Sequence, residues 1–333
     1  MTARGWFLFS LMGVVWGIPY LMIKVAVDAP LSAPFVVFVR CAVGALLLLP
    51  FAMRQGGLRR TVRAHCLPML AFAVIEIMGP WYTLTDAERH LSSSTAGLLI
   101  AGVPIVGVLL ARFFGDTERL GVRRVTGLGL GLAGVGVLTV PHLTGGDAKS
   151  LAEVLVTVVG YATAPLIAAR WLKDVPSLQL TAPCLALAAL VYAPGAALTR
   201  PSAMPSASVL VALAGLGVLC TAVAFVAFLE LIKEIGPTRA TVITYVNPAV
   251  AVVAGVLFLS EPLTVGVGVA FALILTGSVL ATAGPVRVTA APPCPESPVP
   301  WSTRQTSRAD GRVESPLGGL PEERPGSTGQ GDG

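Results

Sequence analysis

Long apolar stretches recur along the first 284 residues of this chain of 333. A helix needs roughly 20 mostly apolar residues to cross the hydrocarbon core of a membrane. Ten windows reach or approach that length: Trp6–Val27, Pro34–Met53, Leu67–Leu84, Thr95–Phe114, Val125–Val140, Leu151–Ala169, Leu178–Leu198, Val209–Leu229, Ala240–Leu259 and Val265–Ala283. Because lipid cannot hydrogen-bond the backbone, we expect an all-α integral membrane protein with ten transmembrane helices.

The composition excludes a soluble domain. Hydrophobic residues make up 54% of the chain and charged residues only 12%, against about 25% charged in a typical soluble domain. A water-soluble fold must cover its surface with polar groups, and this chain carries too few of them.

Basic residues lie in short clusters between the apolar windows, which indicates topology. Loops carrying many Lys and Arg favour the cytoplasmic side. With the N-terminus inside, twelve basic residues fall in cytoplasmic loops: Arg54, Arg59, Arg60, Arg63, Arg112, Arg119, Arg123, Arg124, Arg170, Lys173, Lys233 and Arg239. Only three fall outside: Arg89, Lys149 and Arg200. We therefore expect both termini in the cytoplasm of a multi-pass cell-membrane protein. The net charge of +5 forms no basic stripe interleaved with aromatics, so we expect no nucleic-acid partner.

The last segment, residues 285–333, differs from the rest. It is rich in Pro, Gly, Ser, Arg and Glu and has no apolar periodicity. Such a segment cannot bury enough apolar surface to offset the entropy lost on ordering. We expect a disordered cytoplasmic tail.

The two halves of the apolar region resemble each other. Matching residues lie 144 positions apart, or 143 after a one-residue deletion: Ala96 and Ala240, Pro104 and Pro248, Glu118 and Glu261, Gly134 and Gly277. Residues 1–142 and 150–284 then hold five windows each. Because five is odd, equivalent loops must face opposite sides of the membrane. This pattern predicts two inverted five-helix repeats, an arrangement frequent in secondary transporters.

The motifs resemble those of EamA-type transporters of the drug/metabolite transporter (DMT) superfamily. They comprise Trp16-Gly17, Lys24, Arg40, the segments 92–97 and 103–104, Glu118, and the segments 236–240, 245–248 and 260–263. The resemblance implies two EamA-like repeats around a central cavity. It also implies export or import of metabolites, amino acids or drugs.

Two charged residues lie deep inside apolar windows. Glu76 is near the middle of the third window, and Arg40 is in the outer half of the second. An ionisable group at this depth is expensive and is a functional candidate by default. Glu76 can load and release a proton during transport, and Arg40 can neutralise an anionic substrate group. The alternative, which we favour slightly for Arg40, is a static ion pair between the two.

Several polar-tipped residues also lie well inside the windows. Their donors need partners that lipid cannot provide, so these side chains should face the protein interior. They are Trp16, Tyr20, Tyr161, Tyr245 and Asn247, and they complete the candidate substrate-binding set. Helix packing is the alternative role for each of them.

Pro104 and Pro248 occupy equivalent positions in the two halves. A proline removes one helical hydrogen bond and can kink a helix. We therefore interpret the pair as hinges that flank a central cavity.

The residues Gly129-Leu-Gly-Leu-Ala-Gly134 match a dinucleotide-binding fingerprint by letters only. No strand precedes them and they lie in an apolar window, so we interpret them as a site of close helix packing, with Gly127 and Gly131 at small-xxx-small spacing. The five Cys and three His residues show no metal-ligand spacing. We expect neither a cofactor nor a metal.

These observations predict a secondary transporter, and not an enzyme, that exports a small metabolite, amino acid or drug-like compound by alternating access. Protons are the candidate coupling ion, and membrane lipids are the surrounding partner. Two alternatives come from other classes: a lipid-modifying membrane enzyme and a non-transporting scaffold or sensor. The sequence does not indicate the oligomeric state.

Overall fold

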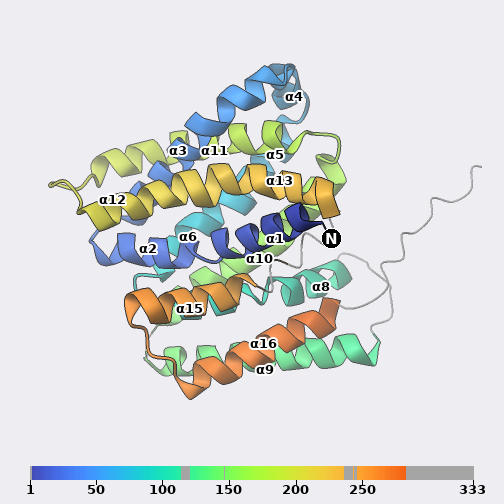
Figure 1. Ribbon diagram of the computed structural model, residues 1–333, viewed down its shortest axis with the longest axis vertical. Coiled ribbons are helices and arrows are strands. Elements are labelled where there is room, and N and C mark those ends of the chain that lie inside the picture. Colours follow the sequence, from blue (N-terminus) through green and yellow to red (C-terminus); the bar gives the residue numbers. More distant parts are fainter. Residues whose placement is uncertain (1, 114–120, 146, 236–242, 244–245, 283–333) are drawn as a thin grey trace, which may run out of the picture. The chain divides into compact units, whose positions relative to one another are not determined.

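The computed structural model describes residues 2–113, 121–145, 147–235, 243 and 246–282. All regular elements in this part of the chain are helices (Figure 1). In chain order they are α1 (Ala3–Val15), α2 (Pro19–Asp28), α3 (Ala33–Arg54), α4 (Leu58–Ala64), α5 (Cys66–Phe72), η1 (Ala73–Met78), α6 (Gly79–Ala87), α7 (Ser93–Ile100), α8 (Val103–Phe113), α9 (Val122–Gly145), α10 (Ala148–Trp171), α11 (Ser177–Leu198), α12 (Ala207–Ala214), η2 (Gly215–Val223), α13 (Ala224–Ile235), α15 (Asn247–Leu259) and α16 (Val265–Thr282). The predicted tail lies outside the described residues.

Among the residues that the structure describes, seven helices are long and apolar enough to cross a membrane. They are Ala3–Asp28, Ala33–Arg54, Cys66–Ala87, Ser93–Leu110, Ala148–Trp171, Ser177–Leu198 and Ala207–Phe228. Three shorter apolar helices lie within the other predicted windows: Val125–Val140, Asn247–Leu259 and Val265–Leu280. An all-helical membrane protein is thereby confirmed, and the number of ten crossings stays a prediction.

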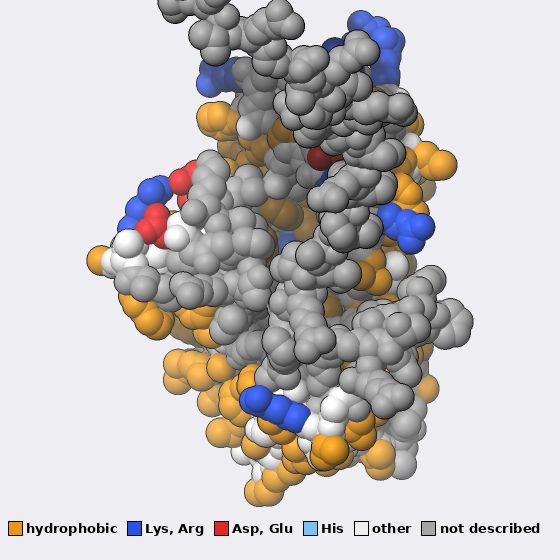
Figure 2. Space-filling model, turned by 90° about the vertical axis from the view of Figure 1, so that its right-hand side faces the viewer, with side chains coloured by type: hydrophobic (Ala, Val, Ile, Leu, Met, Phe, Trp, Pro, Cys, Tyr) orange, Lys and Arg blue, Asp and Glu red, His pale blue; other side chains and the backbone are white. Residues whose placement is uncertain are grey.

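Large apolar side chains point away from the protein on several helices. Leu46, Leu190 and Phe258 are 75%, 71% and 72% exposed. Water would penalise such exposure, whereas lipid tails accept it. Figure 2, which views the face where α1 begins, shows hydrophobic side chains along the flanks and Lys and Arg side chains on the viewed face.

Two of the spanning segments are interrupted next to a proline, and a third described helix begins at one. The turn at residues 16–18 separates α1 from α2, which begins at Pro19. Residues 101–102 separate α7 from α8, in which Pro104 is the second residue. In α15 Pro248 is likewise the second residue. Proline fits a helix start because its missing N–H would have no helical partner there.

Two spans contain a π-helix, η1 and η2. They fall in the third and eighth predicted windows, which are equivalent in the proposed repeat. A π-helix adds a residue to the turn and is frequent at functional sites. At both places the wider π-helical turn alters the directions in which the side chains point.

The helices around the centre pack in two layers, visible in Figure 1. In the front layer α1 contacts α13 and α15, and α2 contacts α12, η2 and α15. In the back layer α10 contacts α5, η1, α6, α7 and α8. The layers meet where α15 and α2 contact α7 and where α2 contacts α6. Two further pairs, α3 with α11 and α9 with α16, stand beside them.

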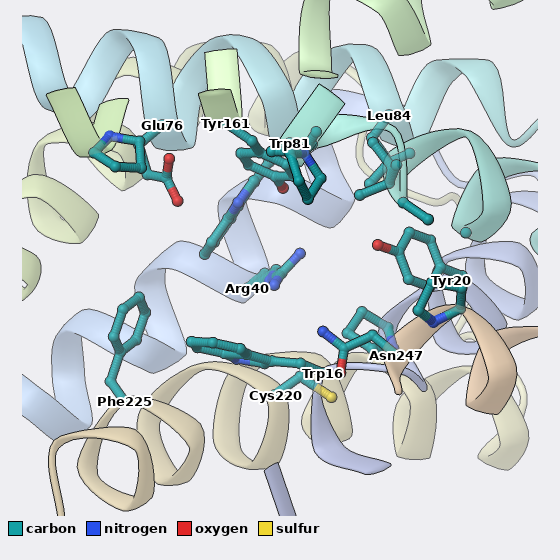
Figure 3. Close-up of a pocket in the computed structure, with 18 residues that line it drawn as sticks. Trp16, Tyr20, Arg40, Glu76, Trp81, Leu84, Tyr161, Cys220, Phe225 and Asn247 are labelled. Carbon is teal, nitrogen blue, oxygen red and sulfur yellow. The ribbon is translucent and has the colours of Figure 1, made fainter. Parts of the chain in front are cut away.

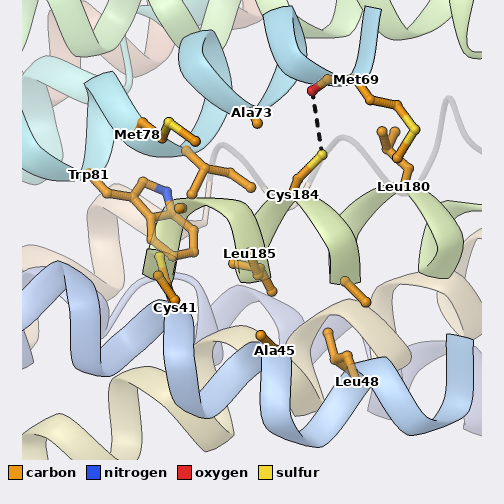
Figure 4. Packing of buried hydrophobic residues seen from close by; sticks show 14 of the residues in the cluster. Cys41, Ala45, Leu48, Met69, Ala73, Met78, Trp81, Leu180, Cys184 and Leu185 are labelled. Atoms are coloured by element: carbon orange, nitrogen blue, oxygen red, sulfur yellow. Dashed lines mark hydrogen bonds between the residues drawn. The ribbon is translucent and has the colours of Figure 1, made fainter. Parts of the chain in front are cut away.

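The α3–α11 pair carries the largest apolar core (Figure 4). Cys41 and Leu48 of α3 are buried against Cys184 and Leu185 of α11, and Trp81 of α6 joins the same cluster. The Cys184 thiol donates to the carbonyl oxygen of Met69, 3.5 Å away. This core holds α3 firmly beside the centre of the protein.

The α9–α16 pair depends on glycine. A Cβ added to Gly277 would lie 2.4 Å from the backbone nitrogen of Gly131 and 2.7 Å from the carbonyl oxygen of Gly127. The two backbones are therefore in direct contact, which only small residues permit. The interpretation of the Gly127–Gly131 segment as a packing site is confirmed.

A carboxylate ties the two halves together at the end of the bundle opposite the start of α1. Glu261 precedes α16 and accepts hydrogen bonds from the backbone N–H groups of Ser93 and Ser94, at 2.7 and 3.0 Å. The Ser94 hydroxyl donates to it as well. An anion is favoured there because the first N–H groups of α7 have no helical acceptor and the helix dipole is positive.

We expect Glu261→Gln to lower the stability of the folded protein by about 1 kcal/mol, the typical worth of a helix-capping group. Thermal unfolding of the purified protein in detergent measures the change. Glu234→Gln is the control, because Glu234 pairs with the exposed Arg4 at 3.8 Å. Equal shifts for the two variants would contradict a special role for the Glu261 cap.

Candidate functional site

A cavity of about 360 Å³ lies between the front and back layers (Figure 3). Its lining is Trp16, Pro19, Tyr20, Arg40, Glu76, Trp81, Leu84, Gly97, Ile100, Ala101, Val103, Pro104, Tyr161, Pro165, Cys220, Phe225, Asn247 and Pro248. The volume is within the range of small-molecule sites, about 300–1,000 Å³. Every predicted site residue that the structure describes lines this cavity, and Tyr245 lies outside the described residues.

Arg40 enters the cavity from α3 and is held on two sides. Its Nε donates to the hydroxyl of Thr221, 3.2 Å away. Its guanidinium carbon lies 3.6 Å from the ring centroid of Trp81, an arrangement that favours a cation. Its two Nη groups have no hydrogen-bond partner among the described residues, so they are available to a ligand.

Thr221 accepts from Arg40 because η2 orients it. Its hydroxyl donates to the carbonyl oxygen of Leu216, five residues earlier, at 2.8 Å. This i to i−5 spacing is the π-helical one. With its proton committed to Leu216, the oxygen can only accept from Arg40.

Glu76 lies on η1, and its carboxylate points into the same cavity as Arg40 (Figure 3). It is half-buried and has no hydrogen bond or ion pair within the described part of the chain. The favoured Arg40–Glu76 ion pair is therefore wrong for this structure. The reason is that Trp81 and Thr221 already hold the guanidinium.

Aromatic rings form much of the remaining wall. Trp16 packs against Phe225 and Phe228, with ring centroids 6.3 and 4.7 Å away. The Tyr20 hydroxyl points into the cavity from the other end in Figure 3. Tyr161 completes the wall from α10. A ligand here meets apolar faces with a few polar tips.

Asn247 has a structural partner. In the amide orientation that satisfies its neighbours, its nitrogen donates to the carbonyl oxygens of Ile243 and Gly13, each 3.1 Å away. A Cβ at Gly17 would meet the Asn247 carbonyl oxygen at 2.9 Å, so α1 and α15 are close enough for these contacts. Asn247 thus fixes α15 to α1 while it lines the cavity.

The two candidate hinge prolines both lie at helix starts on the cavity wall. Pro104 and Pro248 are the second residues of α8 and α15. The N-terminal ends of these helices, where the dipole is positive, therefore border the cavity. Whether these breaks bend during a transport cycle stays a prediction.

Sequence reasoning missed three residues that line the cavity, Trp81, Cys220 and Phe225. It also missed Thr221, which holds Arg40 from behind the wall. An aromatic or a lone Thr in an apolar window suits lipid contact as well as a cavity. Cys220 and Thr221 lie on the π-helix η2, and no pattern in the sequence predicts a π-helix.

A multi-pass helical membrane protein with a polar-tipped cavity between two helical layers has the architecture of a transporter. The model of the EamA-like transporter family matches residues 3–140 and 149–283. The chain therefore belongs to the EamA family of the DMT superfamily.

Relatives carry transporter names. YedA of Escherichia coli K12, an uncharacterized inner membrane transporter, is 28% identical over 81% of this chain and 88% of its own length. A probable terminal-alkyne amino-acid exporter of Streptantibioticus cattleyicolor is 31% identical over 65% of this chain and 73% of its own. A protein of known crystal structure, 21% identical, matches 85% of this chain and 97% of its own with a TM-score of 0.59, which shows a shared fold.

Proposed function

We propose that this protein is a secondary transporter that exports a small zwitterionic metabolite, foremost an amino acid, by alternating access. The observation that carries the proposal is the pair of opposite charges, Arg40 and Glu76, that face one cavity without pairing with each other. The Nη groups of Arg40 suit a carboxylate, because a guanidinium can bind one through two parallel hydrogen bonds. Glu76 suits an ammonium group. The aromatic wall suits an apolar side chain.

The name of the Streptantibioticus relative, a probable amino-acid exporter, supports this substrate class. The lining supports this substrate class too. In a mostly apolar cavity, the few polar groups fix the orientation of the bound ligand as well as the charges it must carry. A purely cationic or purely anionic compound would leave one of the two charges without a partner, which is costly in a desolvated site.

We infer ten crossings in two inverted repeats, with both termini in the cytoplasm. The paired prolines at helix starts and the paired π-helices support the repeat. So does the make-up of the layers: the front layer contains the first, eighth and ninth windows and the back layer the sixth, third and fourth. These sets are equivalent under the repeat. Two equivalent, oppositely oriented layers can rock about a shared cavity.

Proton coupling follows from competition at Glu76. The carboxylate binds either the substrate ammonium group or a proton, but not both. A proton that binds from outside displaces the substrate, and the cycle then exchanges one for the other. The proton gradient across the cell membrane thus drives export.

Glu76→Gln is expected to remove the effect of a pH gradient on amino-acid flux and to weaken substrate binding. A hydrogen bond to a charged group is worth about 1.5–3 kcal/mol, which corresponds to roughly 10–150-fold in affinity. The measurement is flux of radiolabelled amino acids in proteoliposomes with and without an imposed pH gradient. Glu234→Gln, outside the cavity, is the control.

The test also separates the alternative functions. Chemically unchanged substrate on the far side supports a carrier, whereas altered product supports a lipid-modifying or other enzyme. Binding without flux supports a sensor or scaffold. If amino-acid flux by Glu76→Gln still depends fully on the pH gradient, Glu76 has no role in proton coupling.

A further inference from the structure

One acidic side chain near the cavity takes no part in the site described above. Glu88 follows α6 at the end of the bundle opposite the start of α1. It is 0% exposed. Neither of its carboxylate oxygens has a hydrogen-bond partner within the described part of the chain. Buried side-chain oxygens are rarely left in this state, so the group needs an explanation.

The nearest cation is engaged elsewhere. Lys24 of α2 donates to the backbone carbonyl oxygen of Glu88, 2.9 Å away, and pairs with Asp28 at 3.0 Å. It forms no ion pair with the Glu88 carboxylate in the described structure. An ionised, unpaired carboxylate in the interior would cost several kcal/mol. The neutral acid avoids that cost, so the buried position seen in this structure favours a protonated Glu88.

The charged groups that face Glu88 come from three elements. They are Lys24 and Asp28 of α2, Arg40 of α3, and Glu261 of the segment before α16. Burial holds the pKa of the Glu88 carboxyl well above its usual range, Lys24 and Arg40 oppose that shift, and Glu261 and Asp28 add to it. Burial is the largest cause, so exposure to water would lower the pKa again.

Glu88 stands at the seam between the two layers. Tyr20 and Ile23 of the front layer pack there against Leu84 and Ala96 of the back layer. The Lys24 bond to the Glu88 carbonyl crosses the same seam. A Cβ on Gly97 would lie 2.6 Å from the Ala251 Cβ, so the layers touch closely. These contacts close the cavity at this end, which the proposed function places outside the cell.

We propose that Glu88 is a second proton-binding site, which holds the outer side of the transporter closed while it is protonated. When the seam opens, water reaches the carboxyl group, its proton leaves to the external solution, and the carboxylate can pair with Lys24. The proton returns from the same side on closing, so none crosses the membrane at this site. The proposal rests on the proposed transport cycle for its direction.

The dependence on pH follows from linkage. The closed form binds one proton more than the open form, so low external pH favours the closed form. In the titrating range the ratio of open to closed protein rises up to tenfold per pH unit. The outer side of the transporter would therefore close most readily when the external solution is acidic. The proton gradient also drives export under that condition.

A cysteine at Ala26 tests the proposal. Ala26 lies in the closed seam and is 0% exposed. In a background with the native cysteines replaced by serine, a membrane-impermeant thiol reagent is applied from outside at a series of pH values. The rate at which the reagent labels the cysteine at position 26 is divided by the rate at which it labels a cysteine that replaces the exposed Ser202. This ratio corrects for the reagent's own pH dependence. We expect this ratio to rise tenfold or more with pH, and to stay low and flat in Glu88→Gln.

A ratio that is flat in the parent, or that still rises in Glu88→Gln, overturns the proposal. If Glu88→Gln does not fold, Lys24→Met decides: loss of the cation should move the rise to higher pH, and an unmoved or lowered midpoint is contrary evidence. No substrate is present in this experiment. A failure of the amino-acid flux assay therefore leaves its outcome intact, and the two proposals fail separately.

Discussion

Gly277→Leu is expected to lower the stability of the folded protein strongly. The α9 and α16 backbones touch at this glycine, where an added Cβ would lie 2.4 Å from the nitrogen and 2.6 Å from the Cα of Gly131. Backbone atoms cannot rotate away as a side chain can, so the helices must separate along their length. Overpacking in a well-packed core costs about 1–3 kcal/mol, and this contact belongs at or above the upper end. That is a large part of the roughly 5–15 kcal/mol that stabilises a typical protein.

Gly129→Leu is the matched control for that loss. Gly129 lies on the same helix as Gly131, and no atom lies within 4 Å of where its Cβ would be. The two variants add the same side chain, so they differ only in what it meets. Yield after detergent extraction, elution as a single peak and the thermal midpoint should all fall for Gly277→Leu and change little for Gly129→Leu. Equal behaviour would contradict the packing role of Gly277.

The sequence predicts this contact better than it predicts most of the fold. Gly127 and Gly131 stand four residues apart in an apolar window, a spacing with a direct physical consequence for two helices in lipid. The membrane class and the positions of the long helices follow equally directly, since the backbone must satisfy its own hydrogen bonds there. These predictions depend only on local sequence.

The composition of the cavity was also predictable in large part. Arg40, Glu76 and Tyr20 line it because an apolar window leaves a polar group only one favourable direction, toward the protein interior. Their partners were not predictable. Thr221 reaches Arg40 only because η2 adds a residue to the turn, and no residue pattern specifies that insertion.

Glu88 shows the limit most clearly. It comes just after an apolar window, among Asp86, Arg89 and His90, where a charged residue usually faces water. It is instead fully buried, because α2 folds over it and Lys24 is fixed to its carbonyl oxygen. The contact joins residues 64 positions apart, and such pairings depend on tertiary structure.

Arg40→Gln is expected to lower amino-acid transport strongly. The substitution removes the charge that would bind the substrate carboxylate and breaks the contacts with Trp81 and Thr221. Loss of a charged hydrogen-bonding pair costs about 1.5–3 kcal/mol, and a bidentate pair loses more than one bond. We expect transport kcat/KM to fall at least about 100-fold. Arg40→Lys should recover little, because an ammonium group cannot make the same planar, two-point contact. Arg60→Gln, at an exposed position, is the control.

A substrate lacking the carboxylate separates this binding role from a structural one. The parent protein should transport an amino acid far better than its amide, because the amide offers Arg40 no negative charge. In Arg40→Gln that preference should disappear, since the group that distinguishes the two is gone. A variant that is merely less well folded would transport both compounds more slowly and keep their ratio, because the loss then falls equally on each. If a correctly folded Arg40→Gln keeps the parent's ratio of amino-acid to amide transport, then a residue other than Arg40 binds the substrate carboxylate. That result would contradict the proposed binding of a zwitterion by Arg40 and Glu76.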